Sequence, residues 1–444
     1  MKEKEFLPLV AQRLGIVELN KMQKTMLESA SNVSDIMLLS PTGSGKTVAF
    51  TLPLLKWLKP ATGRVQAIVI APSRELVLQI FETIRLLAAG YKVTALYGGH
   101  NVEDEVNSLA GSPDIVVATP GRLLDHSRRG NIELLPVRIL VLDEFDKSLE
   151  LGFEKDMSEL VKRMKNVSRL ILTSATDMEF LPDFMSRRNL KKIDFSGTGD
   201  NPRCRMRTHR VDADAKDKID TLAALLADVM PEGKEKTIVF VNHRESAVRV
   251  ADSLKRVGIR AALYHGALDQ HDREKALALF NNGTCPVLVS TDLASRGLDI
   301  PEVRNIIHYH QPLSSEAYVH RNGRTARQTA DGDIYVLVGP EEDVKDFVEF
   351  DDTVYPEMHT GRTIPPSGVA TLYISAGKRE KISKGDIVGF LTNKGGLDAG
   401  EIGNITLRDH YSMVPVPSDK VKGLEEALAD GKIKGARRKI SVIR

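Results

Sequence analysis

Short apolar runs rich in Val and Ile recur along the chain, and stretches with apolar residues at helical spacing separate them. Continuous apolar runs of this length are typical of parallel strands, because connecting helices cover both faces of such a sheet. We expect strands at residues 36–39, 67–70, 93–96, 114–117, 139–142 and 169–172, and a second series at 237–241, 261–264, 286–289, 305–308 and 333–337. The pattern therefore predicts α/β architecture.

The expected strands are together too many for one ordinary sheet. A polar stretch at residues 196–210, with two glycines and a proline, separates them into two sets. The expected organisation is an α/β domain at 1–196, a linker at 197–210, an α/β domain at 211–356, a linker at 357–368 and a smaller domain at 369–444.

The last domain has a different pattern. Expected strands at 371–374, 403–407, 411–416 and 437–443 and helices at 384–391 and 419–430, the latter capped by Ser418, give the β-α-β-β-α-β order of an RRM. The aromatic RNA-binding string of an RRM is missing from residues 411–416, which disfavours base stacking on this sheet.

Charge is unevenly distributed along the 444 residues. The whole chain has a net charge of +2, but residues 361–444 contain fifteen Lys and Arg against nine Asp and Glu, which is +6 and leaves −4 for the rest. A basic terminal module predicts docking to nucleic acid, with a solvated charged tail as the alternative. Cys204 and Cys285 are too few for a disulfide framework or a zinc site. No apolar run is long enough to span a membrane, and we expect a cytoplasmic protein without a membrane partner.

The segment Ser40-Pro41-Thr42-Gly43-Ser44-Gly45-Lys46-Thr47 lies between the first expected strand and a helix. Backbone N–H groups and a helix N-terminus meet at such a turn and favour phosphate, to which Lys46 adds a charge. The hydroxyl of Thr47 suits Mg²⁺ on a nucleoside triphosphate. Ser40 stands where the strict phosphate-loop pattern has Gly.

Acidic residues follow the strand expected at 139–142, in the segment Asp143-Glu144-Phe145-Asp146. The carboxyl ends of parallel strands share one edge of the sheet, so these acids are expected beside the phosphate loop. One carboxylate can hold hydrated Mg²⁺ and the next can orient the attacking water. Together the two segments predict an NTPase.

Further motifs, in order over residues 6–340, resemble those of DEAD-box RNA helicases. They are Gln23 with Gly15 and Phe6 (Q motif), residues 71–76 (Ia), Gly98-Gly99, residues 119–122 (Ib), residues 174–176 (III), residues 239–242 (IV), residues 290–299 (V) and residues 320–327 (VI). Three departures stand out: Phe145 replaces Ala, Asn322 and Ala326 replace Ile and Gly, and Leu19-Asn20 replaces Pro-Thr. The resemblance implies two RecA-like domains in tandem.

The resemblance also implies site residues. ATP would contact Phe6, Gln23, Thr42, Gly43, Ser44, Gly45, Lys46, Thr47 and Asp299, and Mg²⁺ would be held by Thr47 and, through water, Asp143. The catalytic set would be Lys46, Asp143, Glu144 and the arginine fingers Arg324 and Arg327, with Asp146, Ser174, Thr176, His320 and Arg321 coupling the domains. RNA would contact Arg74, Gly98, Gly99, Thr119, Arg122 and Thr291. These residues suit phosphate and sugar, so the grip would not read base sequence.

Residues 375–389 and 398–405 resemble the RNA-binding domain of DbpA-type DEAD-box proteins, which implies a preference for structured large-subunit rRNA. We expect Lys378, Arg379, Lys381 and Lys384 to hold that RNA, whether in 23S-type rRNA or in pre-50S particles, with Lys432, Lys434, Arg437, Arg438 and Lys439 adding charge. No obligatory protein partner is evident.

The sequence thus predicts an ATP-dependent and Mg²⁺-dependent RNA helicase that remodels rRNA in ribosome biogenesis. Three alternatives remain open at this point. They are a DNA-directed helicase, a non-catalytic RNA-binding scaffold, and a general cold-shock or mRNA-turnover helicase without rRNA preference.

Overall fold

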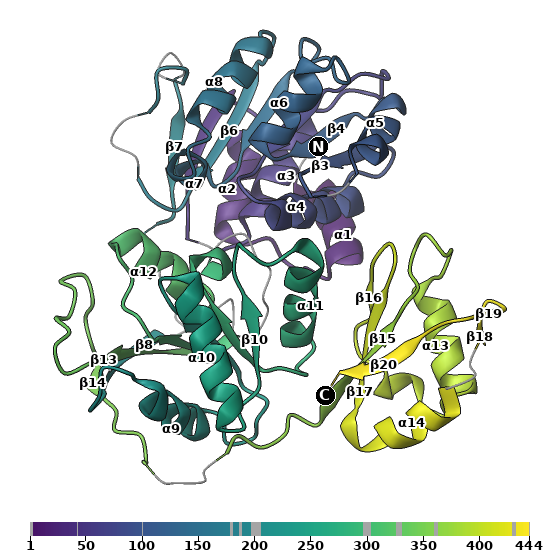
Figure 1. Cartoon of the computed structure of the whole chain (residues 1–444). Helices are drawn as coiled ribbons and strands as arrows, with labels where there is room; N and C mark the ends of the chain where they lie inside the picture. The colour runs from purple at the N-terminus through teal and green to yellow at the C-terminus, as the bar shows by residue number, and fades with distance from the viewer. Residues whose placement is uncertain are drawn as a thin grey trace. The chain divides into compact units, whose positions relative to one another are not determined.

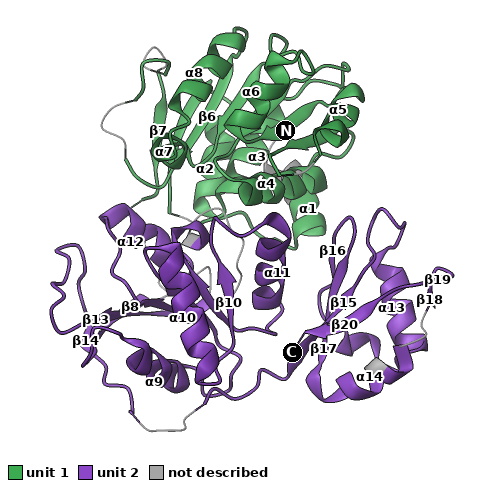
Figure 2. Cartoon of the chain, viewed as in Figure 1, with its two compact units in different colours: residues 1–202, 296–299 green, residues 203–295, 300–444 purple. Residues whose placement is uncertain are grey.

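The computed structural model describes residues 3–41, 43–99, 101–177, 181–185, 189–196, 206–295, 303–325, 331–358, 363–428 and 432–443. The chain forms two compact units (Figure 2), residues 1–202 with 296–299 and residues 203–295 with 300–444. Among the described residues, no helix has the length and apolar character that crossing a membrane requires.

The first unit contains a seven-stranded parallel sheet with the strand order β3-β4-β2-β5-β6-β1-β7. Its strands are β1 (Asp35–Leu39), β2 (Ala67–Ile70), β3 (Val93–Leu96), β4 (Ile115–Ala118), β5 (Ile139–Leu142), β6 (Arg169–Ser174) and β7 (Lys191–Asp194). Its helices are α1 (Glu3–Leu14), α2 (Lys21–Ser29), α3 (Lys46–Trp57), α4 (Arg74–Leu87), α5 (Val102–Ala110), α6 (Pro120–Arg128), α7 (Phe145–Glu150) and α8 (Glu154–Arg163).

Both faces of this sheet are buried. Successive side chains of a strand point to opposite faces. Accordingly, Met37 and Leu39 of β1 belong to one hydrophobic cluster, whereas Ile36 and Leu38 belong to another. Figure 1 shows helices along both faces of the sheet. As predicted, the strands are continuously apolar because helices cover both faces of the sheet.

The second unit begins with another seven-stranded parallel sheet, in the order β10-β11-β9-β12-β13-β8-β14. Its strands are β8 (Met206–Asp212), β9 (Lys236–Phe240), β10 (Ala261–Tyr264), β11 (Val287–Ser290), β12 (Val303–His308), β13 (Gly332–Val338) and β14 (Asp352–Thr353). Its helices are α9 (Ile219–Val229), α10 (Arg244–Arg256), α11 (Gln270–Asn281) and α12 (Ser315–Asn322). Strand β8 begins inside the stretch expected to be a linker. The sequence did not indicate this strand, because its side chains are alternately buried and partly exposed and form no continuous apolar run.

The C-terminal module is an antiparallel sheet in the order β16-β17-β15-β20. Its elements are β15 (Val369–Ile374), α13 (Lys384–Asn393), β16 (Thr406–Leu407), β17 (Ser412–Pro417), α14 (Val421–Leu428) and β20 (Ile440–Ile443), with a hairpin of β18 (Lys432–Ile433) and β19 (Ala436–Arg437). The RRM-like order is confirmed. Ser418 is not the cap of α14, because it begins a short 3₁₀ turn capped by Pro417.

The two faces of the C-terminal sheet have different environments. Leu372 and Ile374 of β15 lie in the module's own hydrophobic core. On the opposite face, Met413 and Tyr411 pack against Ala278 of α11, and Tyr411 Oη donates a 2.8 Å hydrogen bond to Glu274 Oε2. The face that binds RNA in many RRMs is therefore covered by a helix of the same unit.

Candidate functional site

The loop between β1 and α3 has the backbone geometry of a phosphate-binding turn. Gly43 and Gly45 have φ values of 81° and 90°, in the left-handed region that glycine tolerates. Ser40 does not adopt such a φ, so this position does not require glycine. Instead, the Ser40 N–H donates to Ser174 O at 3.1 Å and its hydroxyl donates to Ser44 Oγ at 2.6 Å. The departure from the strict pattern therefore preserves the turn. Thr42 lies outside the described residues.

Lys46 and Asp143 meet at the edge where β1, β6 and β5 are neighbours. Lys46 is 8% exposed, and its ammonium group donates to Ser40 O at 2.8 Å. Burial raises the pKa of the Asp143 carboxyl, although the Lys46 charge and a hydrogen bond from Thr173 oppose this. The structure thus places a buried carboxyl within the field of the phosphate-loop lysine, as the sequence predicted.

Thr173 of β6 supports two acidic residues at once. Its hydroxyl donates to Asp143 Oδ1 at 2.5 Å and accepts from Glu144 N at 3.1 Å. Glu144 has a φ of 46°, which is unfavourable for a residue with a side chain and is typical of strained functional turns. Phe145, the departure from the usual motif, is fully buried in the core and meets Phe184 edge to face at 6.2 Å.

Asp146 connects this acidic segment to the segment after β6. Its Oδ2 accepts hydrogen bonds from Ala175 N at 3.1 Å and from the Thr176 hydroxyl at 3.2 Å. Ser174 is fully buried and donates to Thr176 O. A change at the acidic segment can therefore reach residues 174–176 through direct hydrogen bonds.

Gln23 lies beside the phosphate loop at the start of α2. Asn20 and Gln23 form a reciprocal capping box, in which Asn20 Oδ1 accepts from Gln23 N and Gln23 Oε1 accepts from Asn20 N. Gln23 Nε2 donates to Gly45 O at 3.4 Å, and Asn20 Nδ2 donates to Ser44 O at 3.0 Å. The departure at Asn20 thus ties α2 to the loop. Nothing is described of the Phe6 side chain.

In the second unit, Arg321 of α12 joins three separate motifs. Its fully buried guanidinium forms an ion pair with Asp292 and donates to Asn242 Oδ1 at 2.8 Å and to His310 O at 2.9 Å. These contacts lie within the second unit, and the expected link of Arg321 and His320 to Asp146 and Ser174 stays a prediction. His320 and Arg324 are 3% and 1% exposed. Asp299 and Arg327 lie outside the described residues.

Asn322, another departure, also has a defined contact. Burial and the Arg321 charge lower the pKa of His308 to about 3, so His308 is neutral near neutral pH. His308 Nε2 lies 2.8 Å from Asn322 Oδ1, and because an amide oxygen only accepts, the imidazole N–H donates. Asn322 therefore holds the histidine next to Arg321. Thr291, expected to contact RNA, follows β11 and is half-buried.

The remaining expected RNA contacts of the first unit lie at the ends of β2, β3 and β4. Arg74 begins α4, and a Cβ on Gly99 would lie 2.1 Å from Arg74 Nη1, so the guanidinium rests on the Gly98-Gly99 backbone. Thr119 precedes α6 and makes no side-chain cap, and Arg122 lies in the first turn of that helix. The structure brings the Gly98-Gly99 backbone and two guanidinium groups to one edge of the sheet.

In the C-terminal module, a basic loop precedes α13. Lys378, Arg379, Lys381 and Lys384 are all exposed. The Lys378 and Arg379 N–H groups donate to Arg408 O at 2.8 Å and Asp409 O at 2.9 Å. A Cβ on Gly377 would lie 2.0 Å from Arg408 O, so glycine permits this close approach. The loop is therefore held in place while its charges face solvent.

Comparisons with known proteins decide the family. The DEAD/DEAH box helicase family matches residues 20–181, the helicase conserved C-terminal domain matches 217–329, and the DbpA RNA binding domain matches 371–442. The ATP-dependent RNA helicase DbpA of Escherichia coli is 32% identical over 97% of this chain and 96% of its own length. The chain belongs to the DEAD-box RNA helicase family.

Other relatives agree with this assignment. The Bacillus subtilis ATP-dependent RNA helicase DbpA is 29% identical over 96% of this chain and 95% of its own length. The structure of Saccharomyces cerevisiae Dbp5 bound to RNA and ADP BeF₃ matches with a TM-score of 0.68 and 25% identity, over 80% of this chain and 94% of that chain. Two RecA-like domains and ATP-dependent helicase activity are thereby established, and the scaffold alternative is excluded.

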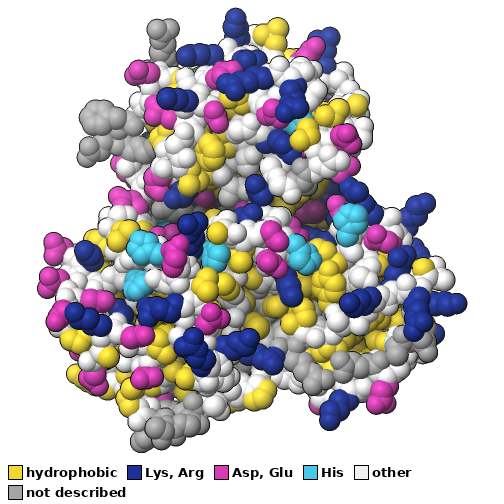
Figure 3. Space-filling view, viewed as in Figure 1, with side chains coloured by type: hydrophobic (Ala, Val, Ile, Leu, Met, Phe, Trp, Pro, Cys, Tyr) yellow, Lys and Arg dark blue, Asp and Glu magenta, His cyan; other side chains and the backbone are white. Residues whose placement is uncertain are grey.

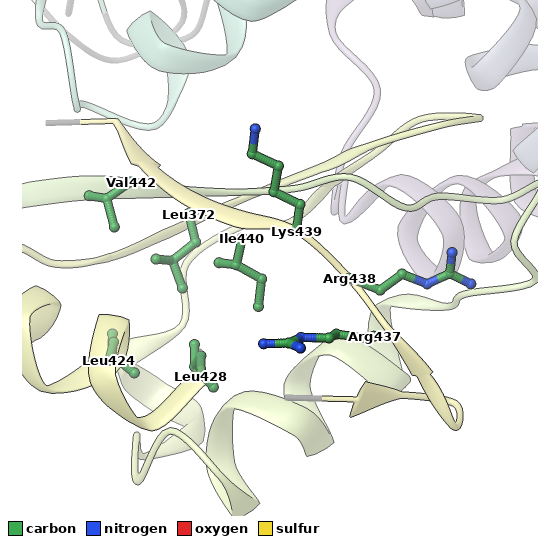
Figure 4. A pocket seen from close by; sticks show the side chains of 8 residues that line it. All are labelled: Leu372, Leu424, Leu428, Arg437, Arg438, Lys439, Ile440 and Val442. Carbon is green, nitrogen blue, oxygen red and sulfur yellow. The ribbon is translucent and has the colours of Figure 1, made fainter. Parts of the chain in front are cut away.

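This DEAD-box helicase has a second basic cluster on its C-terminal module. Lys432, Lys434, Arg437 and Lys439 are exposed, and Figure 3 shows Lys and Arg side chains gathered on the visible face of the module. A cavity of about 580 Å³ lies between β20 and α14, with Leu372, Leu424 and Leu428 in its lining. In Figure 4, the Arg437 side chain reaches beneath the strand toward α14, whereas Lys439 points to the other side. The cluster is thus divided between two surfaces.

Several residues that organise the helicase site were not expected from the sequence. Thr173 and Asn20 look like an ordinary strand residue and an ordinary helix cap. Glu105 of α5 looks like a surface charge, yet it is 2% exposed. A signal existed only for Asn20, whose spacing of three residues from Gln23 is that of a capping box.

Proposed function

We propose that this helicase remodels structured RNA of the large ribosomal subunit, as free 23S-type rRNA or in pre-50S particles, during ribosome assembly. The exposed basic loop of Lys378, Arg379, Lys381 and Lys384 carries the proposal, because it lies in a DbpA-type RNA-binding domain and is held by main-chain hydrogen bonds. The covered sheet face supports it by leaving loop surfaces for RNA.

At the ATP site, we propose that Lys46 and the loop amides bind the phosphates and that Glu144 orients the attacking water. Mg²⁺ would be held by Thr47 and, through water, by Asp143, because a cation beside the buried carboxyl would favour its ionised form. When bound, the ion neutralises charge on the phosphates as the terminal bond breaks. Gln23 would contact the adenine.

Arg324 and Arg327 are proposed to stabilise the transferring phosphoryl group when ATP and RNA close the two helicase domains. An arginine in this role accelerates hydrolysis by roughly 10³ to 10⁵. Arg74, Gly98, Gly99, Thr119, Arg122 and Thr291 would hold the RNA backbone. Because such contacts do not read bases, selection of the RNA would depend on the C-terminal module.

The test is steady-state ATPase of the full chain with no RNA, large-subunit rRNA, poly(A) and duplex DNA. We expect stimulation by rRNA at a concentration at least tenfold below that needed for poly(A), and none by DNA. Glu144→Gln should abolish hydrolysis and shows that the activity belongs to this protein.

Two charge-reversal substitutions test whether the basic loop is responsible for the preference for rRNA over poly(A). Lys378→Glu with Arg379→Glu should remove the advantage of rRNA and leave poly(A) stimulation unchanged. Lys394→Glu with Lys422→Glu changes two exposed lysines of the same module and is the matched control. Equal half-saturation by rRNA and poly(A) in the unmodified protein would replace the proposal with a general RNA helicase.

A further inference from the structure

A buried carboxylate in α5 contacts groups from three other segments of the first unit. Glu105 is 2% exposed, and its Oε1 accepts a hydrogen bond from Tyr97 N at 2.7 Å. Its Oε2 forms an ion pair with Arg122 Nε at 2.6 Å and lies 2.7 Å from Nε2 of His126. A charged group this deeply buried is costly unless fully partnered, and Glu105 has a partner on each oxygen.

The partners of Glu105 belong to two of the three segments of this unit that are proposed to contact RNA, the third being the segment at Arg74. Tyr97 immediately precedes Gly98-Gly99, and Arg122 lies in the first turn of α6 behind Thr119. In Figure 1, α5 and α6 lie near the end of the sheet formed by β3 and β4. One carboxylate therefore fixes the glycine segment and the arginine relative to each other.

His126 completes this arrangement. It is fully buried, and its Nδ1 lies 3.0 Å from Nδ2 of Asn131. Because an amide nitrogen only donates, Nδ1 is the acceptor and the ring proton is on Nε2, where it is donated to Glu105. The Glu105 charge is balanced by the Arg122 guanidinium. No uncompensated negative charge is then left beside a surface that receives phosphate.

We propose that Glu105 and His126 are positioning residues for RNA binding. They hold Arg122 and the Gly98-Gly99 segment at the separation at which both contact one RNA backbone. The inference rests on the proposed function, in which Arg122 contacts RNA. Neither residue touches RNA or ATP itself. Their loss is expected to change the RNA concentration needed for activity and not the rate at saturating RNA.

Glu105→Gln is the main test, because the amide keeps the size of the side chain. All three partners of the carboxylate are donors and an amide has one acceptor oxygen, so in either orientation the NH₂ group faces a donor and at least one contact is lost. We expect the poly(A) concentration that half-saturates ATPase to rise about tenfold or more, with the ATP KM and the saturating rate unchanged. Glu103→Gln, an exposed acid on the same helix, is the matched control and should change neither.

His126→Phe is the second variant, since it keeps a planar aromatic ring and removes both hydrogen bonds of the imidazole, and His126→Gln should restore part of the affinity by donating to Glu105. Thermal melting by circular dichroism identifies any variant that fails to fold. A folded Glu105→Gln or His126→Phe protein with unchanged half-saturation by poly(A) would overturn the inference.

Arg122→Ala separates this inference from the proposed RNA contact. If Arg122→Ala leaves poly(A) binding and its salt dependence unchanged, Arg122 is not an RNA contact. The proposed contact and the positioning role of Glu105 and His126 are then both wrong. If Arg122→Ala weakens binding but Glu105→Gln does not, only the positioning role fails. In the double variant we expect the Glu105→Gln effect to be smaller than in the unmodified protein, because part of it acts through Arg122.

Discussion

Thr173 offers a direct test of how the ATP site is supported. Its hydroxyl is fully buried, donates to the Asp143 carboxyl and accepts from the Glu144 N–H. Thr173→Val keeps the shape of the side chain and removes only these two hydrogen bonds. The substitution therefore isolates polar support of the acidic segment from packing of β6.

The expected cost follows from the two bonds. A hydrogen bond to an ionised group contributes about 1.5 to 3 kcal/mol, and a buried N–H without an acceptor costs about 1 kcal/mol or more. Thr173→Val should thus lower the free energy of unfolding of the first unit by about 2.5 to 4 kcal/mol at pH 8. Losing the donor also raises the pKa of Asp143 further, since the bond favours the ionised carboxylate.

This cost should depend on pH. Where Asp143 is protonated, the bond from Thr173 is between neutral groups and is weaker, so the difference between the two proteins should shrink to about 1.5 to 2.5 kcal/mol at low pH. It grows as pH rises through the raised pKa of Asp143.

Urea unfolding followed by tryptophan fluorescence is the assay. Trp57 is the single tryptophan of the chain, and its ring N–H donates to Ala30 O at 2.9 Å within the first unit. Thr94→Val, at a buried position of β3, is the control and should change stability by less than about 1 kcal/mol. A loss below 1 kcal/mol for Thr173→Val at pH 8, or a loss of equal size at both pH values, would refute the reasoning.

Three further predictions follow from named contacts. Asp146→Asn weakens the bonds to Ala175 N and the Thr176 hydroxyl, so duplex unwinding should fall at least fivefold more than ATP hydrolysis; equal losses would contradict the coupling. Because burial raises the pKa of Asp143, the fold disfavours its ionised form: this group's contribution to stability is full below its ordinary pKa of 3.8 and is lost as pH rises through the raised value. Mg²⁺-dependent ATP binding should accordingly weaken as pH falls through that raised value, measured as the dissociation constant of ATP in the presence of Mg²⁺, and Asp143→Asn should remove that dependence. Tyr411→Phe removes a hydrogen bond worth about 1 kcal/mol to Glu274, so proteolysis of the preceding linker should accelerate about fivefold, and an unchanged rate would show that the bond does not hold the module.

The sequence predicted the elements whose stability depends on continuous apolar runs. The strand at 139–142 and the acids after it are defined by neighbours in the chain, so pattern alone located them. Strand β7 and strand β8 were missed because their side chains are largely exposed and carry little apolar signal. The β18–β19 hairpin was missed because Lys434, at a φ of 49°, occupies a turn position where Asn is the usual signal.

The residues that hold the site together were harder to predict. Glu105 and Thr173 make contacts with residues 8 to 30 positions away in the chain. A helix charge and a strand threonine have unremarkable sequence contexts, and only the packing of α5 on β3 or of β6 beside β5 reveals their partners. Motifs identify the groups that act on substrates, whereas the groups that orient them depend on tertiary structure.

Asn20 shows how a departure from a motif can preserve its chemistry. Its capping box with Gln23 uses one lone pair of Gln23 Oε1, and Gly45 O uses one N–H of Gln23 Nε2. One N–H and one lone pair of the amide are then left for a ligand. The adenine edge presents one acceptor, N7, and one donor, the N6 amino group, whereas guanine presents two acceptors there. Guanine would therefore set its O6 against the remaining lone pair of Gln23, and we expect the bonds that fix Gln23 to the phosphate loop to select ATP over GTP.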